Sequence, residues 1–133
     1  MKRSISSIFA IFIGIFLLVE GIWGQFSNVV FEILTTNRLH ATIHIILGLV
    51  GIWTGIKGGS RSFLKFIGIL LTAVGIMRFV PGLNDLVVNI LNVNQNVAVF
   101  NIIVGIISLI IAFTSSRVQE VTSHNNFPAT GIK

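Results

Sequence analysis

Four long runs of apolar residues, separated by polar segments, set the pattern of this chain. The runs cover residues 5–23, 39–56, 63–80 and 97–113. Each is close to the ~20 residues that cross the hydrocarbon core of a bilayer as a helix. Inside hydrocarbon, every backbone amide must be bonded within its own segment, so such runs are expected to be helical. The pattern predicts an all-α integral membrane protein, a four-helix bundle over residues 1–114.

The polar segments between the runs differ in length. The segment 57–61 is a tight glycine turn, which predicts that the second and third spans are antiparallel neighbours. The connections 24–38 and 81–96 are longer and lie on the opposite side. Their partly apolar stretches, 29–34 and 86–91, are expected to form short interfacial helices. The polar residues 115–133 are expected to form a disordered cytoplasmic tail.

Basic residues near the span ends predict the orientation, because lysine and arginine are retained on the cytoplasmic side. The side of the long connections has only Arg38 and Arg78. The other side has Lys2, Arg3, Lys57, Arg61, Lys65, Arg117 and Lys133. This bias predicts a multi-pass protein of the plasma membrane with both termini in the cytoplasm. No A-x-A cleavage site follows the first run, so that run is expected to be an uncleaved helix rather than a signal peptide.

The two halves of the chain resemble each other. Residues 12–15 and 21–22 match 66–69 and 75–76 at an offset of 54. Residues 33–37 and 45–48 match 90–94 and 102–105 at an offset of 57. We interpret the bundle as two tandem two-helix hairpins, related by a pseudo-two-fold axis along the membrane normal.

Composition narrows the classes of function. Hydrophobic residues make up 53% of the chain and charged residues only 10%, against roughly 25% charged in a soluble domain. The basic residues that give the net charge of +5 lie mostly near the ends of the spans. They do not form the basic stripe on a folded surface that nucleic-acid binding needs, so no nucleic-acid partner is expected. The chain has no cysteine, which excludes disulfides and thiolate metal sites. No nucleophile with a base and an orienting group is found, so the protein is not expected to be an enzyme.

Small residues recur at intervals of three and four along the spans, which places them on one helix face where a neighbouring helix can approach closely. The glycines expected at helix contacts are Gly14, Gly21, Gly48, Gly51, Gly55, Gly68, Gly75 and Gly105. Span three adds Thr72 to this face, and the polar residues expected in the interior are Asn37, Asn94, Asn101 and Arg78.

Two histidines on this face are the best candidates for chemistry. His40 and His44 have the i, i+4 spacing at which two imidazoles can share a metal, and Glu20 at a comparable depth is a candidate third ligand. Glu20 could instead pair with Arg78. Three readings stay open: polar groups that fix the register of the helices, a proton- or cation-responsive site, and a haem ligand, for which only one of the two histidines could serve. No cofactor is assigned.

The motif Asn37-x-x-His40-x-x-x-His44-x-x-x-Gly48, followed by Gly51, resembles an uncharacterised bacterial family of four-span membrane proteins, a domain of unknown function. The resemblance covers residues 5–113 and implies fold and localisation, but no activity. Members of that family often have a similar Asn and His motif in the second half. Here the matching positions are Asn94, Val97 and Asn101, so the second histidine site is absent.

The sequence therefore predicts a small non-enzymatic membrane protein, a structural or accessory component. Its expected partners are the lipid bilayer and either further copies of the chain or a larger membrane complex. The alternative is a small channel or transporter subunit in which Glu20, His40 and His44 respond to protons or bind a cation. A transport path would require a dimer, because four short helices enclose little volume.

Overall fold

The computed structural model describes residues 4–125, and the side chains of residues 4–115. Within this range the elements are α1 (Ile5–Phe26), β1 (Val29–Val30), β2 (Leu34–Thr35), α2 (Arg38–Lys57), α3 (Ser60–Met77), α4 (Leu83–Leu91) and α5 (Gln95–Asn125). Helices α1, α2 and α3 and the Gln95–Ser115 part of α5 are long and apolar enough to cross a membrane. The prediction of an all-α, multi-pass membrane protein with four spans is confirmed.

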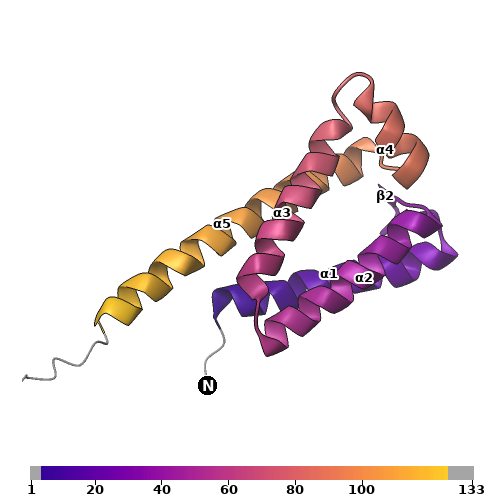
Figure 1. The fold of residues 1–133 in the computed structure, drawn as a ribbon. Coiled ribbons are helices and arrows are strands. Elements are labelled where there is room, and N and C mark those ends of the chain that lie inside the picture. Colours follow the sequence, from indigo (N-terminus) through magenta and orange to yellow (C-terminus); the bar gives the residue numbers. More distant parts are fainter. Residues whose placement is uncertain (1–3, 126–133) are drawn as a thin grey trace, which may run out of the picture.

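The spanning helices pack as two pairs, α1 with α2 and α3 with α5, and the pairs diverge from each other (Figure 1). The glycine turn joins the two pairs, and α2 packs against α3 much less extensively than against α1. The reason is that α2 directs most of its glycine face toward α1. In the turn itself, Gly58 and Gly59 have φ values of 120° and 92°, which favour glycine.

Glycines bring each pair into backbone contact. A Cβ built on Gly14 would lie 2.7 Å from the carbonyl oxygen of Gly48, and one on Gly68 would lie 2.8 Å from that of Gly105. Likewise Gly21 faces Ala41 of α2, and Gly75 faces Ala98 of α5. Gly55 also faces α1, whereas Gly51 lies between α1 and Phe63 of α3. Equivalent positions of the two halves therefore make equivalent helix contacts.

Apolar side chains fill the space where the two pairs meet. Ala10, Ile13 and Leu17 of α1 belong to the same buried cluster as Leu64 and Ile67 of α3. The second buried cluster lies under the long connections and contains Val30, Leu34, Val87, Val93, Val97 and Ala98. Both clusters contribute to the packing of the α3–α5 pair against the α1–α2 pair. The second cluster also packs the long connections against one end of the bundle.

The two long connections differ from each other. The predicted interfacial helix over 86–91 is found as part of α4, but 29–34 forms a β-hairpin in which Val29 pairs with Thr35 and Val30 with Leu34. Phe31 and Glu32 turn the hairpin with φ values of 51° and 65°. β-Branched residues such as valine and threonine favour strands over a one-turn helix, which explains the error. The hairpin and α4 lie at the same end (Figure 1).

Helix α5 continues to Asn125, into the segment expected to be a disordered tail. Neither proline nor glycine occurs between residues 106 and 127, so no helix breaker ends it at the predicted span boundary. The remaining part of the predicted tail, 126–133, lies outside the described residues.

Candidate functional site

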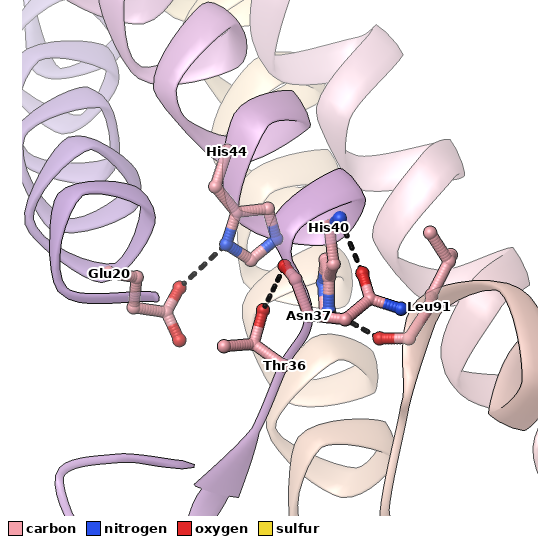
Figure 2. Close-up of polar contacts among 6 residues, drawn as sticks. All are labelled: Glu20, Thr36, Asn37, His40, His44 and Leu91. Atoms are coloured by element: carbon pink, nitrogen blue, oxygen red, sulfur yellow. Dashed lines mark hydrogen bonds and ion pairs between the residues drawn. The ribbon is translucent and has the colours of Figure 1, made fainter. Parts of the chain in front are cut away.

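A carboxylate and an imidazole meet inside the α1–α2 pair. Glu20 Oε2 lies 3.1 Å from Nδ1 of His44, and the two residues are only 8% and 6% exposed (Figure 2). The close approach of the helices at Gly21 explains the contact. A Cβ there would lie 2.7 Å from the carbonyl oxygen of Ala41, so the backbone of α1 rests on the first turns of α2. Glu20 therefore points at His44, which the sequence left undecided.

His40 extends this pair toward α4. Its ring stands edge-on to that of His44, with 4.3 Å between ring centroids, as their i, i+4 spacing allows. Its Nδ1 lies 3.0 Å from the carbonyl oxygen of Leu91, the last residue of α4 (Figure 2). Because a carbonyl oxygen only accepts, Nδ1 holds the proton in this contact. The buried polar residues thus form a chain from α1 through α2 to α4.

Asn37 sets the start of α2. Its Oδ1 accepts from the backbone N–H of His40 at 2.8 Å, the usual N-cap arrangement, and its Nδ2 donates to the carbonyl oxygen of Ile90 at 2.7 Å. One side chain therefore begins the helix that holds both histidines and ties that helix to α4.

A small cavity of about 10 Å³ borders the site. Its polar lining consists of Glu20, Thr35, Thr36, His40 and His44, and its apolar lining of Val30, Leu34 and Val97. A volume of this size holds about one water molecule. The cavity is far smaller than the ~300 to 1,000 Å³ of typical small-molecule pockets, and it leaves no room for a haem.

The geometry differs from the predicted metal site at Glu20, His40 and His44. No group of three such side chains is placed to hold a metal ion within the described part of the chain. The reason lies in the direction of the ring nitrogens: Nδ1 of His44 faces Glu20, whereas Nδ1 of His40 faces Leu91. The arrangement is suited to moving or sharing a proton between a carboxylate and an imidazole.

The remaining polar candidates lie apart from this pair. Arg78 does not pair with Glu20, and its Nε donates instead to the carbonyl oxygen of Val93 at 3.0 Å. Asn101 is buried, as predicted, and its Nδ2 has no hydrogen-bond partner among the described atoms. At the offsets of 57 and 54, Asn101 corresponds to His44 and Val74 to Glu20. The carboxylate–imidazole pair therefore has no counterpart in the second half.

The connections do show reciprocal contacts between the halves. Asn94 caps α5, since its Oδ1 accepts from the N–H of Val97 at 2.8 Å, and its Nδ2 donates to the carbonyl oxygen of Ile33 at 3.0 Å. Ile33 corresponds to Ile90, so Asn37 and Asn94 make the same two bonds in opposite directions. Such mutual contacts are typical of two units related by a two-fold axis.

Sequence reasoning missed the role of Thr35. Its hydroxyl donates to the carbonyl oxygen of Asn92 at 2.6 Å and accepts from the N–H of Asn94 at 3.0 Å. In turn, Nδ2 of Asn92 donates to the carbonyl oxygen of Thr36 at 2.8 Å. The signal was present in the repeat, because Thr35, Thr36 and Asn37 precede the second helix of the first half, and Asn92 and Asn94 precede that of the second.

Comparison with known proteins identifies a family. A family model described as a domain of unknown function, DUF4383, matches residues 7–114, which cover nearly all of the four spans, the two long connections and the Glu20–His44 pair. No curated protein and no solved structure matches the chain. The match confirms the resemblance seen in the sequence, and this four-span membrane protein belongs to the DUF4383 family.

Proposed function

We propose that this protein is a non-enzymatic accessory component of the plasma membrane, in which the Glu20–His44 pair joins α1 to α2 and holds the bundle in shape. The observation on which this rests is the closure of the site. Both side chains are buried, and the cavity beside them has a volume of only about 10 Å³. Such a site supports a role in packing and assembly more than the conversion of a substrate.

The energetics of a buried pair provide the test. Removing one partner leaves the other buried and uncompensated, which costs about 3 to 5 kcal/mol, whereas replacing both by apolar residues is often neutral or stabilising. We therefore expect Glu20→Ala and His44→Ala each to lower the free energy of unfolding by about 3 kcal/mol, and Glu20→Leu/His44→Leu to restore most of it.

The measurement is reversible unfolding in mixed detergent micelles, monitored by circular dichroism. Light scattering records the oligomeric state. A matched control is Leu49→Ala in α2, whose side chain is 54% exposed. If the single variants are as stable as the parent protein, the pair does not hold the bundle together and the proposal fails.

A second candidate function is a subunit of a small channel or transporter that responds to protons. One observation favours it: an ionisable carboxylate lies against an imidazole inside the spanning region, beside a cavity with room for a water molecule. Ionisable residues within membrane spans often belong to proton or ion pathways. In proteoliposomes containing a pH-sensitive dye, a transporter would show a proton flux that Glu20→Gln and His44→Ala abolish. An accessory component would show no flux in any variant.

The proposed orientation can be tested with single cysteines, because the chain has none of its own. Ser62 beside the glycine turn and Asn89 on α4 are both exposed and lie at opposite ends of the bundle. On intact cells, a membrane-impermeant maleimide should label Asn89→Cys but not Ser62→Cys until the membrane is opened. The reverse pattern would place both termini outside.

A further inference from the structure

A groove runs along the face of α5 at the end of the bundle opposite the Glu20–His44 pair. It has a volume of about 390 Å³ and is lined by Ile106, Leu109, Ile110, Phe113 and Thr114. These positions lie on one side of the helix, within the span Gln95–Ser115. From Ile106 to Phe113 the helix rises about 10 Å, so the groove follows the spanning direction for roughly a third of the hydrocarbon thickness.

Two cations from α3 contact α5 beside the end of this groove. The Nζ of Lys65 lies 5.3 Å from the centroid of the Phe113 ring, and Nε of Arg61 donates to the carbonyl oxygen of Ala112 at 3.4 Å. Arg61 and Lys65 are one helical turn apart and contact consecutive residues of α5. Phe113 therefore belongs both to the apolar wall of the groove and to the contact with an ammonium group.

Acidic groups are absent near these cations among the described side chains. The acidic side chains that are described belong to Glu20 in the second half of α1, Glu32 in the hairpin and Asp85 in α4, all at the other end of the bundle. The positive charge of Arg61 and Lys65 is thus not balanced by a described carboxylate. An anion that also has a long apolar chain would complement both the charge and the groove.

We propose that the α5 groove and its two cations bind an anionic phospholipid. One acyl chain lies along Ile106, Ile110 and Phe113, and the phosphate lies between the guanidinium of Arg61 and the ammonium of Lys65. Long basic side chains extend along apolar surface toward the headgroup level in this manner. This site is separate from the Glu20–His44 pair, so neither proposal depends on the other.

The experiment is native mass spectrometry of the delipidated protein titrated with dioleoyl phosphatidylglycerol or dioleoyl phosphatidylcholine. We expect one phosphatidylglycerol to bind more tightly than phosphatidylcholine. A basic residue near an anionic membrane surface contributes about fivefold in affinity, so Arg61→Gln/Lys65→Gln should weaken phosphatidylglycerol binding about 25-fold. Lys57→Gln removes one charge from the same end, at an exposed position in the turn, and should change binding less than twofold.

A second variant tests the groove itself. Ile110→Trp fills the groove and leaves both cations in place, so it should also weaken phosphatidylglycerol binding. Circular dichroism of each variant establishes that the helices are retained. Equal binding of the two lipids, an equal loss with Lys57→Gln, or no effect of Ile110→Trp would each overturn the proposal.

Two further outcomes would assign the groove to another occupant. Glycerol 3-phosphate that competes as well as the intact lipid would show a phosphate site without a role for the acyl groove. A dimer that persists after lipid removal and dissociates with Ile110→Trp would show that a second copy covers this face. In either case the proposal is overturned.

Discussion

Replacing Gly48 by alanine tests how closely α1 and α2 approach each other. A Cβ at this position would lie 2.6 Å from the carbonyl oxygen of Gly14 and 2.7 Å from the backbone nitrogen of Leu18. Both are backbone atoms of α1, so no side chain can rotate away. Ordinary contact begins near 3.4 Å, and the helices must therefore separate by about 0.8 Å.

This separation reaches the Glu20–His44 pair. His44 lies one turn before Gly48 on the same face of α2, and its 3.1 Å contact with Glu20 would lengthen beyond hydrogen-bond distance. Overpacking of this kind costs about 1 to 3 kcal/mol, and alanine returns about 1 kcal/mol through its higher helix propensity. Including the weakened pair, we expect Gly48→Ala to lower the free energy of unfolding by about 2 kcal/mol.

The assay is reversible unfolding in mixed micelles, with two comparison variants. Ala73→Leu adds bulk at an exposed position of α3 and should change the free energy of unfolding by less than about 0.5 kcal/mol. Gly105→Ala creates a clash in the other pair, where a Cβ would meet the side chain of Thr72 and the carbonyl oxygen of Gly68. Because the second half has no carboxylate–imidazole pair, this variant reports the cost of overpacking alone. If Gly48→Ala is as stable as the parent protein, the close approach of α1 and α2 is refuted.

Three further predictions concern the connections. Asn37→Ala and Asn94→Ala each remove a helix cap and one hydrogen bond to the other half, so each should lower the free energy of unfolding by about 2 kcal/mol. Thermal melts should show similar decreases in melting temperature for the two variants. Thr35→Val leaves two backbone groups without their partner; a loss of about 1 to 3 kcal/mol is expected, and an unchanged melting temperature would contradict it. His40→Leu removes the donor to Leu91, which should accelerate amide hydrogen exchange at the end of α4 more than in α5.

The fold class followed from the sequence because the bilayer constrains it strongly. Within the hydrocarbon, the backbone amides of an apolar run of spanning length are hydrogen-bonded within the run only if it is a helix. Small residues at intervals of three and four identified the helix faces that meet. Buried Asn101 and the α5 contact of Gly75 agree with that pattern. The hairpin at 29–34 was not predicted, because a stretch of about six residues contains too little periodicity to distinguish a strand from a helix.

The candidate site was predicted only in part. The spacing of His40 and His44 placed both on one face, yet periodicity could not say which nitrogen each ring directs at which neighbour. Glu20 lies about 100° from Gly21 around the helix, so its direction depended on the rotation of α1 against α2. The tertiary structure resolves this through the contact of Gly21 with Ala41. The contact of His40 with Leu91 depends on where α4 docks, which no local pattern encodes.

The sequence by itself determined the number of spans, their helical form and the small-residue faces, because these depend on short-range periodicity and on the solvent that surrounds the chain. Only the tertiary structure decided that Glu20 faces His44, that Arg78 bonds to Val93 and that His40 contacts Leu91. These outcomes depend on contacts between residues far apart in the chain. Such contacts are selected by how well whole surfaces fit together, and a single run of residues does not contain that information.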